Sequence, residues 1–115
     1  MKTFNDFSGV EGIDKLMECA PYVNELLKDK DTLSKMSDMT WIELGATMYK
    51  AHAEACDKLF AALDKKPDTS IGLVSATAQV MSEILNNKDM IDFFISAGKA
   101  KKSSGSVTEN TEGEQ

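Results

Sequence analysis

The chain has 115 residues, of which 42% are hydrophobic and 28% charged, with a formal net charge of −6 and two cysteines. This length allows one domain with a single core, and two cysteines are too few for a secreted disulfide framework. All thirteen basic residues are lysine, so an acidic chain without arginine is a poor partner for nucleic acid or for anionic membranes. The chain has neither a signal-peptide core nor an apolar window of about 18 residues that could span a bilayer, and we expect a soluble cytoplasmic protein.

The N-terminal third predicts an arm followed by helix. Residues 1–9 have little pattern, although Phe4 and Phe7 can pack onto the core from this arm. From residue 10 an apolar stripe runs in helical steps, and Pro21 within it predicts a kink or a break near Cys19. The stripe consists of Ile13, Leu16, Met17 and Ala20, and continues after the proline with Val23, Leu26 and Leu27. Residues 28–31 then form a polar corner, and residues 32–36 allow one short helix.

Residues 40–64 predict a long central helix around which the other segments pack. Apolar residues recur there at steps of three and four in two neighbouring rows, while charged residues follow the opposite side. Thr40 and Glu43 have the spacing of a capping box at its start. One row is Trp41, Leu44, Met48, Ala51, Ala55, Leu59 and Leu63, and the other is Ile42, Gly45, Tyr49, Ala53, Cys56 and Phe60.

The C-terminal half predicts two more helices and a tail. Pro67 ends the central helix, and Asp68 or Thr69 caps a helix that continues to residue 85. A short helix over 88–97 follows Asn86 and Asn87, with Gly98 as its cap, and the polar residues 99–115 are expected to be disordered. The predicted fold class is therefore all-α, a compact bundle of about five helices in a domain spanning residues 10–98.

Two stretches of the chain echo each other. Residues 24–33 align with residues 82–91 and share a glutamate, two branched apolar positions, a Lys-Asp pair and a later apolar residue. Shared local structure explains the echo most simply, because both stretches read as a helix, a polar corner and a second helix. A pseudo-symmetric pair of helical hairpins is the alternative.

Candidate chemical sites are weak. His52 and Cys56 have the i, i+4 spacing of two zinc ligands, but two ligands do not make a site and no further metal motif accompanies them. Asp29 and Asp31 resemble the start of a calcium loop that then lacks its glycine and its bidentate glutamate. No glycine-rich phosphate loop is present, and His52 with Cys56 on one regular helix is a poor nucleophile and base pair. We therefore expect no catalytic residue, no metal and no cofactor.

Three stretches resemble the small tail assembly chaperones of siphophages that infect Gram-positive bacteria. They are the corner at residues 25–29, the opening Thr-Trp-Ile-Glu-Leu-Gly of the long helix at residues 40–45, and the close at residues 84–94, followed by a polar tail. The resemblance implies a non-enzymatic role in the cytoplasm of the bacterial host. The implied partner is the long, helical, apolar tape measure protein, and other tail proteins are further candidates. A longer product made by ribosomal slippage is also implied, although a protein sequence cannot show it.

The physical mechanism that fits this role is the capture of a client helix in an apolar groove. Residues 88–97 carry more large apolar side chains than one helix face can hide, so we expect part of this segment to be exposed. The alternative is that these side chains simply fill the core. The candidate partner-binding residues are Trp41, Met48, Tyr49, Met90, Ile91, Phe93, Phe94 and Ile95.

Two other classes of function remain open. An acidic regulatory or decoy protein would bind a basic host protein through its charged surface, and its affinity would fall steeply as salt rises. A small enzyme centred on His52 and Cys56 would lose function when either residue is replaced by alanine. Self-association is also left open by the sequence.

Overall fold

The computed structural model describes residues 4–63 and 66–104, the last seven for their backbone only, and in these ranges the chain forms helices without any strand. The all-α prediction is confirmed. The elements are a short 3₁₀ helix η1 (Phe4–Asp6), α1 (Gly9–Leu27), α2 (Lys30–Ser34), a second 3₁₀ helix η2 (Met36–Asp38), α3 (Trp41–Ala51), α4 (Ala53–Ala62), α5 (Ser70–Leu85) and α6 (Lys88–Ser104).

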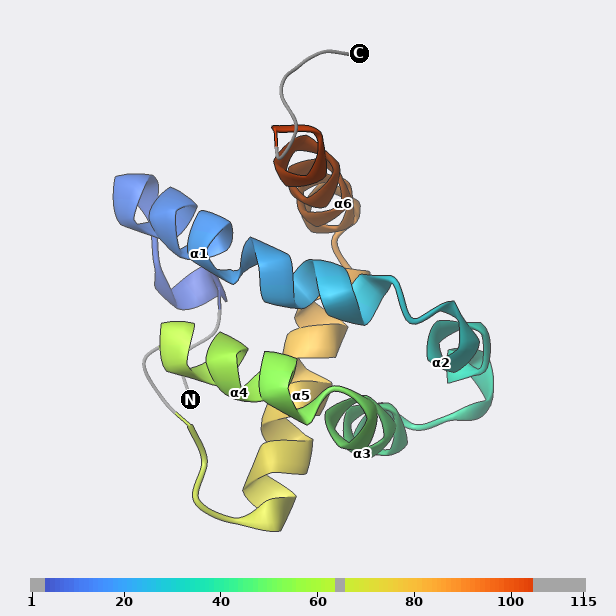
Figure 1. The fold of residues 1–115 in the computed structure, drawn as a ribbon. Helices are drawn as coiled ribbons and strands as arrows, with labels where there is room; N and C mark the ends of the chain where they lie inside the picture. Colours follow the sequence, from blue (N-terminus) through green and yellow to red (C-terminus); the bar gives the residue numbers. More distant parts are fainter. Residues whose placement is uncertain (1–3, 64–65, 105–115) are drawn as a thin grey trace.

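Helix α1 lies between α4 on one side and α6 on the other (Figure 1). Helix α5 packs closely against α3 and also contacts α6. One continuous core joins these helices, because the apolar stripes predicted from helical spacing face one another. Its largest completely buried side chains are Val23, Leu26, Leu44, Met48, Leu59, Phe60, Leu63, Val80, Met81, Ile84 and Phe94.

The predicted single helix over residues 40–64 is wrong, because the chain breaks at His52 into α3 and α4 (Figure 1). His52 has φ −135° and ψ 47°, outside the helical region. The break lets α3 pack on α5 while α4 turns to pack on α1, so each of the two helices finds its own partner. Neither glycine nor proline marks the break in the sequence.

The contact between α3 and α5 depends on small residues. Gly45 is buried, and a Cβ atom built on it would lie 2.6 Å from the carbonyl oxygen of Val74 and 2.7 Å from the amide nitrogen of Ala78. Backbones approach this closely only where no side chain intervenes. Gly45 thus brings the two helices into direct backbone contact.

Capping side chains fix the helix ends. The predicted capping box at the start of α3 is confirmed, since the Thr40 hydroxyl accepts from the Glu43 amide and the Glu43 carboxylate accepts from the Thr40 amide. Thr69 caps α5 by accepting from the amide of Gly72. At each of these ends a side chain satisfies a backbone donor that the helix leaves unpaired.

The two stretches that echo each other in sequence form equivalent corners. In each, a helix ends at a leucine, Leu27 or Leu85, and a new helix begins at a lysine three residues later. Asp29 caps the first of these new helices and Asn87, its counterpart in the alignment, caps the second. The echo therefore reflects a shared corner.

The ends of the described chain were predicted in part. Phe4 and Phe7 pack onto the core, as the sequence predicted, and both are buried there. Of the kink or break predicted near Cys19, the break is absent, because α1 continues through Pro21. Helix α6 continues through Gly98 to Ser104, so Gly98 does not end it, and the rest of the predicted tail, 105–115, lies outside the described residues.

Candidate interaction surface

An apolar groove lies between α1 and α6. Its volume is about 490 Å³, and the described residues that line it are mostly apolar, with Glu18 as the one charged residue among them. The lining residues are Met17, Glu18, Ala20, Pro21 and Tyr22 of α1 and Phe93 and Ala97 of α6. Asn24 ties the two helices together at one end of the groove, where its side-chain amide donates to the carbonyl oxygen of Phe94 at 3.2 Å.

The groove continues into an exposed apolar row on α1. Val10, Ile13 and Met17 follow one another at helical steps of three and four, so they lie on one face. Their exposed fractions are 76%, 55% and 62%. Helix α6 rises away from α1 (Figure 1), and among the described elements no helix covers the exposed row Val10, Ile13 and Met17.

Pro21 adds a polar feature to the groove. Proline has no amide hydrogen, so the carbonyl oxygen of Met17 lacks the donor that an α-helix would supply four residues later. Both residues line the groove. An occupant can therefore meet a backbone acceptor as well as an apolar wall.

The predicted partner-binding residues separate into four groups. Met48 and Phe94 have no exposed surface, so they belong to the core and leave the predicted set as a correction. Periodicity placed them on apolar faces but could not show that other helices cover those faces. Met90 and Ile91 pack half-buried against the core. Phe93 lines the groove and Ile95 is 38% exposed, so the segment is only partly interior.

Trp41 and Tyr49 lie elsewhere. Trp41 lines a smaller apolar hollow of about 200 Å³ with Met36, Met39 and Leu44, at the start of α3. Tyr49 is half-buried, and its hydroxyl donates to Asp57 at 2.8 Å, a bond that raises the pKa of the tyrosine. The structure therefore does not bring these two residues together with the groove residues of α6.

The exposure of Ile13 and Met17 was not predicted, because they share the apolar stripe of α1 with Leu16 and Ala20. The available signal was the breadth of the whole apolar surface of this helix. Its apolar residues at 10, 13, 16, 17, 19, 20, 23 and 26 spread over roughly 200° of the helix circumference, whereas one packed face covers about 100°.

His52 is a structural joint. Its Nδ1 lies 3.1 Å from a carboxylate oxygen of Glu25, on α1, and its Nε2 lies 2.8 Å from a carboxylate oxygen of Asp29, the cap of α2. Partial burial alone would lower the pKa of His52, but the two carboxylates outweigh burial and raise it. Asp29 also accepts from the amide and hydroxyl of Thr32, and its pKa is lowered first by the amide and then by His52.

The cysteines are inert. Cys19 and Cys56 are both free and buried, and burial raises the pKa to about 12 for Cys19 and to about 11 for Cys56. A nucleophilic thiol or a metal-binding thiolate needs the opposite shift. Among the described residues no group of three or more His, Cys, Asp or Glu side chains is arranged to hold a metal ion.

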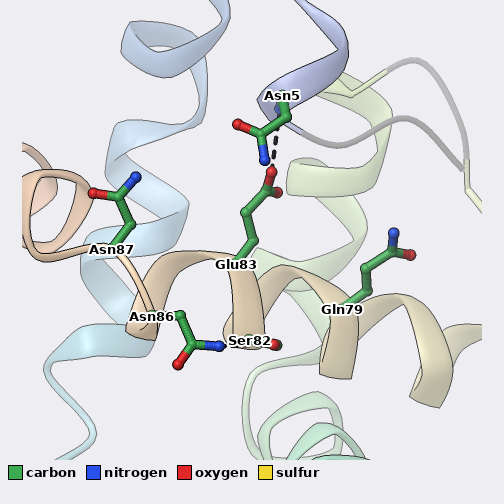
Figure 2. Close-up of a pocket in the computed structure, with 6 residues that line it drawn as sticks. All are labelled: Asn5, Gln79, Ser82, Glu83, Asn86 and Asn87. Carbon is green, nitrogen blue, oxygen red and sulfur yellow. Dashed lines mark hydrogen bonds between the residues drawn. The ribbon is translucent and has the colours of Figure 1, made fainter.

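A polar hollow of about 470 Å³ opens beside α5 and is lined by Asn5, Gln79, Ser82, Glu83, Asn86 and Asn87 (Figure 2). Among the described residues that line it, Glu83 is the only ionisable one, and its two carboxylate oxygens accept from the amides of Phe4 and Asn5, each at 3.2 Å. Figure 2 shows the carboxylate directed at the N-terminal segment. Glu83 thus anchors that segment, and the hollow offers no free base.

None of the helices in the described ranges combines the length and the apolar composition needed to cross a bilayer. Comparisons of the chain with known protein families, with curated proteins and with solved structures find no match. The case for a function therefore depends on the chain's own residues.

Proposed function

We propose that this protein is a non-enzymatic tail assembly chaperone that binds an apolar helical segment of a phage tape measure protein in the cytoplasm of the bacterial host. The α1/α6 groove holds the client helix and keeps its apolar face from water until the tail tube assembles around it. The resemblance at residues 25–29, 40–45 and 84–94 supplies the identity of the client. The groove supplies the mechanism.

The observation that carries the proposal is the apolar row of Val10, Ile13 and Met17 running into the groove. Three large apolar side chains on one helix face, each more than half exposed, leave a surface that a second helix would cover. A client helix lying along α1 would place its own side chains against this row and against Phe93 across the groove.

The polar groups of the protein support a binding role. His52, Glu25 and Asp29 bond to one another at a helix junction, and Glu83 is occupied by two backbone amides. These groups serve the fold, whereas the apolar groove of about 490 Å³ between α1 and α6 has no structural role among the described residues and is larger than the apolar hollow of about 200 Å³ beside Trp41. Binding by shape and apolar contact is the function that such a surface performs best.

Ile13 and Met17 provide the test. Fully burying a side chain of their size contributes ~1.5–3 kcal/mol, so completing the burial of two half-exposed side chains should contribute ~2–3 kcal/mol to binding. The double variant Ile13→Ser/Met17→Ser should therefore weaken client binding by about 30- to 100-fold. Both residues are exposed, so the variant should fold normally.

The experiment is co-expression with a siphophage tape measure protein, followed by pull-down and titration with its helical segments. The matched control is Ile71→Ser, since Ile71 is 66% exposed on α5 and does not line the groove. Retained binding by the control and loss by the groove variant support the proposal. Failure of the wild-type protein to bind any tape measure segment, or equal binding by all variants, would overturn it.

Ionic strength separates this role from the alternative of an acidic decoy. A decoy that binds a basic host protein by charge should lose orders of magnitude in affinity as salt rises, because screened surface charges supply all of its attraction. A groove that binds mainly by apolar contact keeps most of its affinity. A tape measure gene directly downstream of this one favours the chaperone, and its absence favours the decoy.

A further inference from the structure

The uncovered face of α1 carries an acidic row beside its apolar row. Glu11, Asp14 and Glu18 follow at steps of three and four, the same spacing as Val10, Ile13 and Met17, so the two rows run side by side along the helix. All three carboxylates are exposed. The apolar row thus has α6 and the groove on one flank and a line of negative charge on the other.

Among the side chains that the structure describes, only Lys15 lies near the acidic row. Lys15 is the single basic residue of α1, and its ammonium donates to the carbonyl oxygen of Ala62 at 2.9 Å and lies 3.6 Å from Glu18. Within the described part of the chain, Glu11 and Asp14 form no ion pair. From Glu11 to Glu18 the row extends about 10 Å along the helix axis.

We propose that the occupant of the α1/α6 groove is a cationic amphipathic helix, whose apolar stripe lies on Val10, Ile13 and Met17 and whose lysine or arginine residues face Glu11, Asp14 and Glu18. This inference rests on the proposed function and specifies the client segment. The spacing of the acidic row requires basic residues at i, i+3 or i+4, and i+7 along one edge of the client's apolar stripe.

A second copy of this chain is a poorer occupant. Symmetric pairing through α1 would bring the same surface of each copy together, and the two acidic rows would then lie close to each other. The whole chain carries a formal charge of −6, which adds to the repulsion. A positively charged partner would lower the repulsion among these carboxylates, whereas a second copy would raise it.

The test uses two synthetic helical peptides as probes. Both carry the same leucine stripe, and one has lysine and the other glutamate at the flanking i, i+4 and i+7 positions. Fluorescence anisotropy measures the binding of each peptide to the full chain and to two variants of it. The rim variant, Glu11→Gln/Asp14→Asn/Glu18→Gln, removes the three charges of the acidic row. The groove variant, Ile13→Ser/Met17→Ser, removes two apolar side chains of the exposed row. Circular dichroism melts verify that every variant is folded.

The matched control removes three exposed negative charges away from the groove, by Asp31→Asn/Asp38→Asn/Glu54→Gln. Glu54 pairs with Lys58 at 3.2 Å, as Glu18 lies near Lys15, so each triple variant includes one carboxylate with a lysine neighbour. The rim and control variants have the same net charge. Any difference between them therefore reports the position of the charges.

An exposed ion pair changes affinity by roughly 1.4- to 5-fold, so the rim variant should bind the lysine probe about tenfold more weakly. The control variant should stay within about twofold of the wild type, and the wild type should prefer the lysine probe to the glutamate probe. Raising the salt concentration should weaken the binding of the lysine probe to the wild type by no more than the triple substitution of Glu11, Asp14 and Glu18 does.

Each other outcome overturns the inference in an identifiable way. Equal binding of both probes, with loss only in the groove variant, would remove the charge preference and leave the proposed function intact. Equal weakening by the rim and control variants would show diffuse attraction to an acidic protein. A dimer of the free chain that the groove variant dissociates would make a second copy the occupant. No binding of either probe, or of any tape measure segment, would remove both the inference and the function.

Discussion

Gly45→Ala is the substitution to which the packing of this fold should respond most sharply. In an isolated helix the change is favourable by ~1 kcal/mol, because alanine is the better helix former. In this protein the new Cβ would lie 2.6 Å from the carbonyl oxygen of Val74, 2.7 Å from the amide nitrogen of Ala78 and 2.9 Å from the Ala78 Cβ. The two nearest neighbours are backbone atoms, which cannot rotate away.

Helices α3 and α5 would have to separate by most of an ångström to admit this methyl group. Overpacking of a tight core costs up to ~3 kcal/mol, so after the gain in helix propensity we expect a net destabilisation of ~2 kcal/mol. For a domain of this size that corresponds to a fall in melting temperature of about 10 °C. Urea denaturation followed by circular dichroism measures the change in the free energy of unfolding.

Two companion variants make the result specific. Ala61→Gly, at an exposed position of α4, reports helix propensity alone and should cost ~1 kcal/mol. Gly45→Ala/Ala78→Gly removes only the contact between the two Cβ atoms and leaves both backbone clashes, so it should not restore stability. A Gly45→Ala protein as stable as the wild type, or full rescue by the double variant, would refute the close contact between α3 and α5.

The remaining predictions concern the polar and thiol groups. His52→Gln should lower the free energy of unfolding by ~1–2 kcal/mol at about pH 5.5 and change it little near pH 9, as measured by denaturation at a series of pH values. The reason is that the pKa of His52 is raised in the folded protein, so its stabilising effect is complete below the unfolded pKa of about 6.5 and is lost as pH rises through the folded pKa. A destabilisation that does not depend on pH would contradict a charged His52 bonded to Glu25 and Asp29. Cys19 and Cys56 should react with a thiol reagent near pH 8 only as fast as the protein opens, whereas rapid labelling of the native protein would contradict their burial. Glu83→Ala should lower the free energy of unfolding by ~1–2 kcal/mol, because the amides of Phe4 and Asn5 lose their shared acceptor. The same variant should be cleaved faster by proteases on the N-terminal side of Gly9. An unchanged cleavage rate would show that Phe4 and Phe7 alone hold the N-terminal segment.

Local features were the most predictable from the sequence. The capping box of Thr40 and Glu43 and the cap at Thr69 depend on residues three positions apart, and local spacing alone determines such bonds. The all-α class followed from apolar residues at helical spacing. These features do not require knowledge of what lies on the other side of each helix.

The break at His52 could not be read from the sequence, because its cause is not local. Both apolar rows continue across it, and the chain bends so that α3 can reach α5 and α4 can reach α1. Glu25 and Asp29, which bond the imidazole at the break, come from a distant part of the chain. That His52 bonds to these two carboxylates could be recognised only from the three-dimensional arrangement of the helices.

The sequence predicted the apolar character of the groove residues but not which of them are exposed. Helical spacing shows that a face is apolar but cannot tell whether another helix covers it. Phe94, a candidate partner-binding residue for which the core was the open alternative, is buried, while Met17, a member of the apolar stripe of α1, is exposed. The divergence of α6 from α1 decides which residues remain uncovered. That divergence depends on the Asn24 contact to Phe94 and on the packing of α6 against α5.

The most direct test of a client-binding groove is a titration of the ¹⁵N-labelled full chain with a helical tape measure segment, followed by NMR. We expect the amide signals of residues 10–20 and 22 on α1 and of residues 93–97 on α6 to shift together, to saturate with one affinity, and not to shift in the Ile13→Ser/Met17→Ser variant. Shifts confined to the hollow beside Trp41, or spread evenly over the acidic surface, would contradict this expectation.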